Sequence, residues 1–289
     1  MSWVSIDKDN CNDCGICVIR CIRCFAEKDD EIVVYADENN CNLCGHCVSL
    51  CPTDAVVHHK MNMDNFIDID DKIKFDTDEF IQLVRRRRSH RSFKNKDVPL
   101  QDLESLVDLC RYAPTGSNRQ TVEIIMIQDD KKIKRLSDLT VDFFKDMIDQ
   151  VERQVEELKG AGKEIPEDLQ YTYSNLVSRK RLVVARDLGM DPIFYKAPAV
   201  MIFHSPTLTS TPKDDCVIAA QTVVLTAMTM GLETCYIGLF EAAARDYPPI
   251  GEELMLPPGN QVLSVLILGY PRLTYLRTVD RKPIKVRWE

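Results

Sequence analysis

The sequence lacks the features of several classes of protein. It has no apolar run of the ~20 residues that span a bilayer, because the stretches 217–230 and 262–268 are short or contain polar breaks. It has no excess of basic residues, and its net charge of −8 argues against nucleic acids or anionic membranes as partners. Its first ten residues have neither the basic nor the apolar region of a secretory signal. We therefore expect a cytoplasmic protein of one or two domains.

Cysteine, in contrast, is concentrated in one part of the chain. Of the 12 cysteines, all but Cys110, Cys216 and Cys235 fall within the first 51 residues. A disulfide framework would need an oxidising compartment, and the sequence shows no export signal. Ligation of a metal or an iron–sulfur cluster is therefore the favoured interpretation.

Eight of these cysteines form two copies of the pattern C-x2-C-x2-C-x3-C. Three thiolates at this spacing can bind three corners of a cubane, and in two-cluster ferredoxins the fourth ligand comes from the other copy. Residues 1–60 thus resemble a bacterial ferredoxin domain with two [4Fe–4S] clusters. One cluster is assigned to Cys11, Cys14, Cys17 and Cys51, and the other to Cys21, Cys41, Cys44 and Cys47.

Alternatives remain open at this point. Paired C-x-x-C motifs also bind zinc, although zinc has no use for the third regularly spaced thiolate. Cys24 is an extra thiol that could replace Cys21, but its use would break the spacing, and Ile22 stands where the first copy would carry proline. Residues 1–60 contain five basic and ten acidic residues, which suits either docking on a basic redox partner or simple solubility.

The rest of the chain alternates helical and strand patterns. Residues 61–75 are polar and acidic and predict a linker, and residues 76–289 predict a second domain. Asp76 with Glu79 resembles a capping box at the start of a helix. The other helices are expected after Pro99, over 136–188 with a break near 160–166, and over 214–230; strands are expected over 121–127, 200–204 and 262–268.

Three motifs of this second domain are candidates for ligand binding. Residues 87–91 (RRSHR) could hold a phosphate with guanidinium groups and a hydroxyl, or they could be a solvated helix end. Residues 113–120 (APTGSNRQ) are rich in turn formers, as in a loop that holds a ligand, or in an ordinary helix-to-strand connection. Gly238 interrupts the apolar segment 235–240 and would let a flat ring approach closely.

In this order the motifs resemble the FMN-dependent nitroreductase family over about residues 77–287. Further matches are Asp215, Ala219 and Gln221 in one helix and the segment 269–271 (GYP). The resemblance implies an α+β fold with a central, mostly antiparallel sheet flanked by helices. It also implies a homodimer with FMN at the subunit interface.

The resemblance also assigns roles within the FMN site. Arg87, Ser89, Arg91 and Arg281 would hold the phosphate and ribityl chain; Pro114, Thr115, Ser117 and Asn118 would line the ring; Ile237, Gly238 and Leu239 would cover its other face. The family has a second C-terminal basic residue where this chain has Val279. Arg88 or Arg277 could replace that contact.

The combination of domains predicts a function. Clusters pass single electrons, whereas a flavin can collect them and deliver a pair. We expect an FMN-dependent oxidoreductase of nitroaromatic, quinone-like or activated unsaturated compounds, with NAD(P)H or a ferredoxin-type protein as donor. No residue is assigned as a catalytic acid. The alternatives are an electron-transfer module that serves a protein partner, and a zinc-binding regulator on an inactive flavoprotein scaffold.

Overall fold

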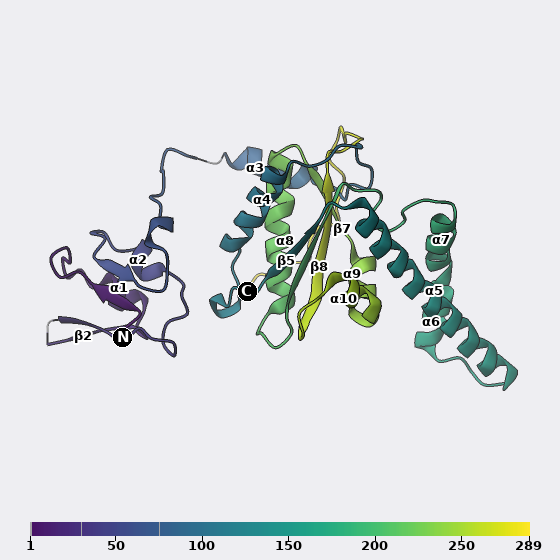
Figure 1. Ribbon diagram of the computed structural model, residues 1–289, viewed down its shortest axis with the longest axis horizontal. Helices are drawn as coiled ribbons and strands as arrows, with labels where there is room; N and C mark the ends of the chain where they lie inside the picture. Colours follow the sequence, from purple (N-terminus) through teal and green to yellow (C-terminus); the bar gives the residue numbers. More distant parts are fainter. Residues whose placement is uncertain (1, 30, 75) are drawn as a thin grey trace. The chain divides into compact units, whose positions relative to one another are not determined.

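The computed structural model describes residues 2–29, 31–74 and 76–289. Met1 and Asp30 of the predicted first domain and Phe75 of the predicted linker lie outside the described residues. The chain divides into two compact units (Figure 1): residues 1–75 with 117–119 form the first, and residues 76–116 with 120–289 form the second. No helix of the described residues is long and apolar enough to span a membrane.

The first unit consists of two similar halves. Strand β1 pairs antiparallel with β4, and β2 pairs antiparallel with β3. Helices α1 and α2 begin directly after Gly15 and Gly45, whose φ values of 68° and 71° favour glycine. The elements are β1 (Val4–Ile6), α1 (Ile16–Arg20), β2 (Phe25–Lys28), β3 (Glu31–Val34), α2 (His46–Ser49), β4 (Val56–His58) and the 3-10 turn η1 (Met63–Asn65).

The first unit has a small core that extends past residue 60. Its buried side chains include Val4, Phe25 and Val56, and Met63 and Phe66 pack against them. Phe66 also lies beside Gly45, where an added Cβ would come within 3.1 Å of the ring. The ordered unit therefore includes the start of the predicted linker, because an aromatic side chain there is packed.

The second unit is built on a four-stranded sheet in the order β5-β6-β8-β7, and all of its pairs are antiparallel. This confirms the predicted α+β class with a mostly antiparallel central sheet. The elements are α3 (Thr77–Arg86), α4 (Leu100–Leu109), η2 (Cys110–Tyr112), η3 (Gly116–Asn118), β5 (Glu123–Ile127), α5 (Asp130–Gly160), α6 (Glu167–Ser174), α7 (Leu176–Asp187), β6 (Ala199–Pro206), α8 (Pro212–Thr229), β7 (Glu233–Tyr236), α9 (Gly238–Asp246), α10 (Pro248–Leu254) and β8 (Asn260–Gly269).

Helices cover both faces of this sheet, as Figure 1 shows. Alternate residues of a strand point to opposite faces, and β6 follows this rule. Val200 and Ile202 pack in the core formed with α5, α9 and α10, whereas Met201 and Phe203 pack in the core formed with α4 and α8. The two cores explain why β6 has an uninterrupted apolar sequence.

Several helix boundaries follow from capping. Asp76 accepts a hydrogen bond from the backbone N–H of Glu79 at 2.9 Å, which confirms the predicted start of α3. The long helix was predicted from residue 136, but α5 begins at Asp130, because Asp129 accepts from the N–H of Lys132 at 2.7 Å. The predicted break near 160–166 is confirmed by the end of α5 at Gly160.

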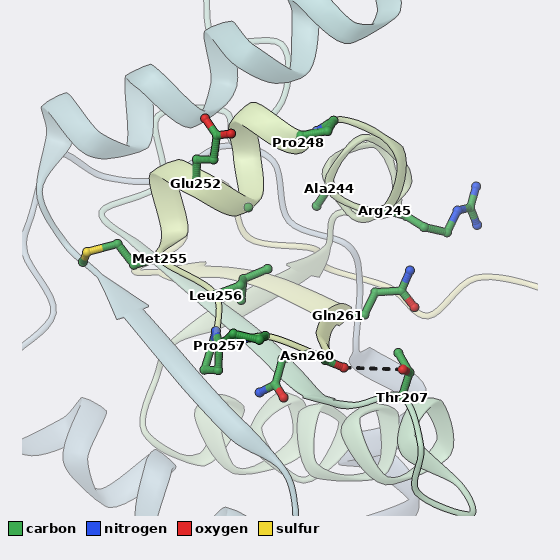
Figure 2. Close-up of a pocket in the computed structure, with 13 residues that line it drawn as sticks. Thr207, Ala244, Arg245, Pro248, Glu252, Met255, Leu256, Pro257, Asn260 and Gln261 are labelled. Carbon is green, nitrogen blue, oxygen red and sulfur yellow. Dashed lines mark hydrogen bonds between the residues drawn. The ribbon is translucent and has the colours of Figure 1, made fainter.

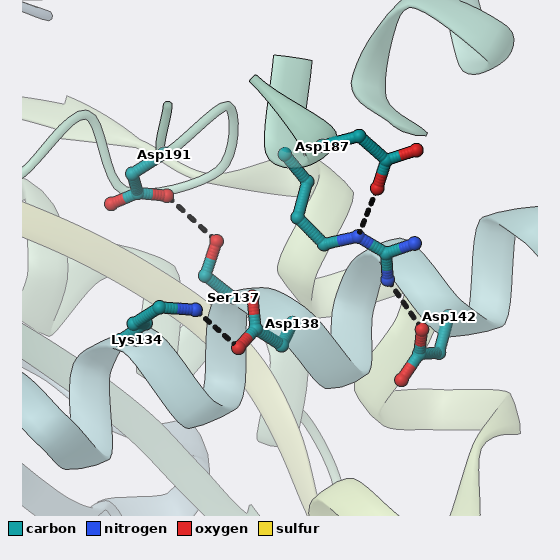
Figure 3. Close-up of polar contacts among 7 residues, drawn as sticks. Lys134, Ser137, Asp138, Asp142, Asp187 and Asp191 are labelled. Atoms are coloured by element: carbon teal, nitrogen blue, oxygen red, sulfur yellow. Dashed lines mark hydrogen bonds and ion pairs between the residues drawn. The ribbon is translucent and has the colours of Figure 1, made fainter. Parts of the chain in front are cut away.

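Polar contacts join α5 to the end of α7 and to the chain that follows it (Figure 3). Ser137 donates to Asp191 at 2.7 Å, and the Arg186 guanidinium bridges Asp142 and Asp187. Farther along α5, Ile148 and Val151 pack against Leu176 of α7. The segment 136–190 is therefore an ordered helical hairpin whose first helix is shared with the core.

Candidate functional site

The cysteines of the first unit line a small cavity. Cys11, Cys14, Cys17 and Cys51 surround it together with Gly15, and Cys47 reaches it as well. These four cysteines are the predicted ligands of one cluster, and they come from both copies of the motif. The residues present therefore fit the ligand set that a cubane needs, in which the fourth thiolate is remote in sequence.

Two half-buried thiols, Cys17 and Cys47, lie near other cysteines of their own predicted ligand sets. Burial raises the pKa of Cys17, and the neighbouring Cys11 and Cys14 raise it further. Burial likewise raises the pKa of Cys47 to about 11, with added contributions from Cys44, Cys41 and Cys21. Cys17 and Cys47, both half-buried, thus lie near other members of their own predicted sets, although Cys47 also reaches the cavity of the other set.

Cys51 differs from these thiols in its hydrogen bonding. Although burial acts to raise its pKa, backbone N–H groups after it lower the pKa overall. These groups belong to Thr53, Val56 and Ala55, and the N–H of Ala55 lies 3.2 Å from Sγ. Such donors favour the thiolate, which is the form that binds metal.

Cys24 lies beside the second set of cysteines. It is 2% exposed. Burial raises its pKa to about 12, and the proximity of Cys21 and Cys41 contributes. The structure therefore places Cys24 beside Cys21 and Cys41, and the choice of Cys21 over Cys24 as a ligand stays a prediction.

Within residues 2–29, 31–74 and 76–289, no group of three or more His, Cys, Asp and Glu side chains is close enough to hold a single metal ion. The cysteine spacing in the sequence remains the reason to expect clusters and not zinc.

The arginine motif of the second unit follows α3 and runs beside β7. The N–H of His90 donates to the carbonyl of Thr234 at 3.0 Å. Burial raises the pKa of the Cys235 thiol on β7, while the Arg91 charge and the Ser89 hydroxyl act to lower it. Arg87 and Ser89 are half-buried and Arg91 is exposed. The motif thus presents two guanidinium groups and a hydroxyl beside Cys235.

Arg88 has a different environment from its neighbours. It is 8% exposed and donates from Nη1 to the carbonyls of Arg85 and Arg87, at 2.8 and 2.6 Å. Its guanidinium therefore caps the carboxyl end of α3, where cations are favoured. Nε of Arg88 is buried without a hydrogen-bond partner among the described residues.

His90 and Glu233 form a buried pair near the arginines. His90 Nε2 lies 3.4 Å from Glu233 Oε2, but the two atoms are not aligned for a hydrogen bond. Burial, together with Arg88, lowers the pKa of His90. Burial raises the pKa of Glu233, against the effect of three nearby arginines. A neutral imidazole is therefore favoured, and the pair is not a strong ion pair.

The loop 113–120 is held by a residue that the sequence motifs did not single out for this role. Asp215 at the start of α8 is 2% exposed, and its Oδ1 accepts from the N–H of Gly116 at 2.9 Å and from Thr211 at 2.9 Å. A Cβ on Gly116 would lie 2.1 Å from Thr211 Oγ1. Only glycine fits between the loop and α8 without a shift.

The same loop has an unusual backbone. Ser117, Asn118 and Gln120 have φ values of 54°, 54° and 52°, a region that non-glycine residues adopt rarely. The N–H of Gln120 donates to Thr115 Oγ1 at 3.0 Å and closes the turn. Strained backbone of this kind gathers at ligand-binding segments.

Gly238 is exposed at the first turn of α9, where β7 ends. A Cβ there would meet no atom within 4 Å. The N-cap residue Ile237 makes no side-chain hydrogen bond to the first turn of α9. Lys213 of α8 donates to Glu241 of α9 at 2.5 Å. Lys213 and Asp215 thus join α8 to α9 and to the loop at Gly116.

Three of the predicted FMN segments thus adjoin elements of the second unit: residues 87–91 lie beside β7, Gly238 begins α9, and Gly116 is held by α8. Arg281 lies exposed in the segment 272–289, which forms no helix or strand. Residues 87–91 and Gly238 provide cations, a hydroxyl and an open glycine, which fit a phosphorylated planar cofactor.

A wider cavity lies elsewhere on the second unit (Figure 2). It has a volume of about 580 Å³ and is lined by residues of α9, α10 and the start of β8, among them Arg245, Glu252 and Gln261. None of the predicted FMN residues lines it. A larger cavity of about 730 Å³, lined by residues of α5 and α6, contains none of the predicted FMN residues either.

Two family models match the chain, one over the cysteine-rich region and one over most of the second unit. The model of the "Nitroreductase family" matches residues 84–270, and that of the "4Fe-4S binding domain" matches residues 34–57. The chain belongs to the nitroreductase family and is an oxidoreductase with an iron–sulfur cluster-binding domain at its amino-terminal side.

The individual relatives have low sequence identity to this chain. The chain is 24% identical over 215 residues to the chloronitrobenzene nitroreductase of Comamonas testosteroni, covering 67% of this chain and 88% of that protein. It is 28% identical over 204 residues to the 4-nitrobenzoate reductase of Nocardioides sp., covering 66% and 80%. A nitroreductase of Bacteroides fragilis solved with bound FMN has the same fold, with a TM-score of 0.53, 21% identity, and coverage of 73% of this chain and 100% of that chain.

Proposed function

We propose that this chain is an FMN-dependent reductase whose two [4Fe–4S] clusters pass single electrons to FMN. One observation carries the proposal: a cysteine-lined cluster unit and a nitroreductase-family domain share one polypeptide. Reduction of an organic substrate consumes two electrons, whereas a cluster delivers one at a time. Bound FMN would supply the missing chemistry, because a flavin can accept single electrons and deliver them as a pair.

The chain's own residues bind and orient the flavin. Arg87, Ser89 and Arg91 hold the phosphate side, with Arg281 of the carboxyl-terminal segment, and Arg88 keeps this motif in place through α3. Pro114, Thr115, Ser117 and Asn118 line one face of the ring, with Asp215 fixing the loop through Gly116. Ile237, Gly238 and Leu239 cover the other face, and Gly238 leaves room for it.

The substrates we propose are nitroaromatic, quinone-like or activated unsaturated compounds. The two relatives named above are reductases of nitroaromatic compounds, and this chain covers most of their length. No side chain of the site is proposed as an essential acid, because His90 is held neutral behind the arginine motif. Solvent then supplies the proton.

We also propose a homodimer in the cytoplasm, with FMN at the subunit interface. Helix α3 has no buried residue, and its apolar side chains Phe80 and Val84 are 45% and 47% exposed. In the carboxyl-terminal segment, Leu276, Ile284 and Trp288 are 84%, 87% and 90% exposed. A second copy of the chain would cover such surfaces, and reduced cluster thiols suit the cytoplasm.

The test begins with anaerobic purification and analysis of iron, sulfide and flavin, for which we expect about eight irons per chain and one FMN. A reduced ferredoxin should then bleach the flavin absorbance, and a nitroaromatic should restore it. A variant lacking residues 1–75 should retain FMN and NAD(P)H oxidation but lose reduction by ferredoxin. Reduction of that folded variant at the full rate would contradict the electron route.

The same assay addresses the second candidate, an electron-transfer module for a protein partner. The acidic composition of residues 1–60 favours this alternative, since an acidic face can dock on a basic partner. The electron-transfer module would be favoured if ferredoxin reduced the flavin but only a protein acceptor reoxidised it. Small molecules of the proposed classes would then fail to reoxidise the flavin.

A further inference from the structure

A buried histidine with no role in the site described above lies against one of the proposed cluster ligands. His58 ends β4 and is 1% exposed. Its Nε2 lies 3.4 Å from Sγ of Cys41. Pairing of β4 with β1, in which His58 is opposite Val4, fixes the backbone at this position. The contact therefore belongs to the ordered core of the first unit.

The hydrogen bonds of His58 determine which ring nitrogen carries the proton. The backbone N–H of Lys60 lies 3.2 Å from Nδ1. A backbone N–H can only donate, so Nδ1 accepts and carries no proton. The ring proton of His58 therefore lies on Nε2, the nitrogen that faces Cys41.

We propose that His58 donates an N–H···S hydrogen bond to the Cys41 thiolate and thereby raises the reduction potential of the cluster bound by Cys41. This inference rests on the proposed pair of clusters. Reduction makes a cluster more negative, and a donor to a ligand sulfur stabilises the more negative state. The matching position of the first copy holds Lys28, which is exposed, so His58 acts on one cluster only.

The experiment is a redox titration of the full chain, with both clusters present, followed by electron paramagnetic resonance. His58→Phe removes the N–H but keeps a ring, and we expect one of the two midpoint potentials to fall. A tenfold weaker preference for the reduced state corresponds to about 59 mV for one electron. Cys44→Ser, which alters another ligand of the same set, should perturb the same couple.

Two further variants separate hydrogen bonding from packing. His58→Gln retains an N–H donor and should restore most of the potential. His59→Phe is the matched control, because His59 is exposed and its Nε2 contacts Ser5 Oγ at 2.9 Å, not a sulfur. This control should leave both potentials unchanged.

Iron content distinguishes failure of this inference from failure of the proposed function. A parent chain with iron for a single cluster would contradict the proposed function. Two clusters whose potentials do not respond to His58→Phe would overturn the inference alone. Loss of iron from both His58 variants would also overturn it, since His58 would then be needed to hold the cluster.

Discussion

The two units differ in how their proposed cofactor sites relate to their cores. In the first unit, Cys17, Cys47 and Cys51 pack against the few buried apolar side chains, so the proposed ligands belong to the core itself. In the second unit, two apolar cores flank the sheet, and Arg91 and Gly238 lie exposed outside them. A cofactor in the first unit should therefore stabilise the fold of that unit. FMN in the second unit should instead bind to a fold that forms without it.

The largest expected effect comes from removing iron and sulfide. We expect the first unit to unfold, because a domain of this size with so small a core depends on its metal. Hydrogen exchange should show loss of protection in β1 and β4 and unchanged protection in β6 and β8. Removal of FMN is the control and should leave all four strands protected. Persistent protection of β1 and β4 without iron would show that the first unit, like the second, stays folded without its cofactor.

The next effect concerns the charges that hold FMN. Arg91→Ala or Arg281→Ala should each remove a charge-assisted contact of about 1.5–3 kcal/mol, which weakens FMN roughly tenfold to a hundredfold. Fluorescence titration of the flavin measures this change. Arg153→Ala, on the exposed surface of α5, is the matched control. Equal FMN affinity in the variants and the parent would show that these arginines do not bind the phosphate.

A smaller effect is expected at the carboxylate behind the loop. Asp215→Ala leaves the Gly116 N–H without its acceptor, at a cost of about 1–3 kcal/mol in the free energy of unfolding. Thermal unfolding of the second unit should shift downwards, and FMN affinity should fall less than in Arg91→Ala. Asp214→Ala changes the neighbouring, exposed carboxylate and should have no such effect. The same midpoint for both variants would exclude Asp215 as the anchor of the loop.

The smallest expected effect is at the spare thiol. Cys24→Ser should retain about eight irons per chain, while Cys21→Ser should lose iron from one cluster. Replacement of Cys110, Cys216 or Cys235 should also leave the iron content unchanged. If instead Cys24→Ser loses half of the iron, Cys24 is the ligand and Cys21 is the spare residue.

Local patterns explain which features the sequence could predict. The cap of Asp76 on Glu79 and the end of α5 at Gly160 depend on neighbours within a few residues, and both are confirmed. The predicted strands agree with β5, β6 and β8 to within two residues at each end. Their long apolar runs are distinctive because both faces of the sheet are covered.

Contacts between distant residues explain what the sequence could not predict. The bond from Gly116 to Asp215 spans 99 residues, and no local spacing indicates it. The direction of the Arg88 side chain depends on the carbonyls at the end of α3 and could not be read from a run of four arginines. The contact of His58 with Cys41 likewise joins residues 17 positions apart, and no local spacing predicts it.

The continuity of α5 has a mechanical consequence for the helical hairpin. At about 1.5 Å per residue, its 31 residues extend about 46 Å without a break. Ile133 and Leu136 near its start are buried against the sheet, and Ile148 and Val151 near its far end support α7. The hairpin has no flexible joint at its base, so it cannot swing as a lid unless α5 bends and gives up backbone hydrogen bonds. A force applied at its tip is transmitted through a stiff lever to the core.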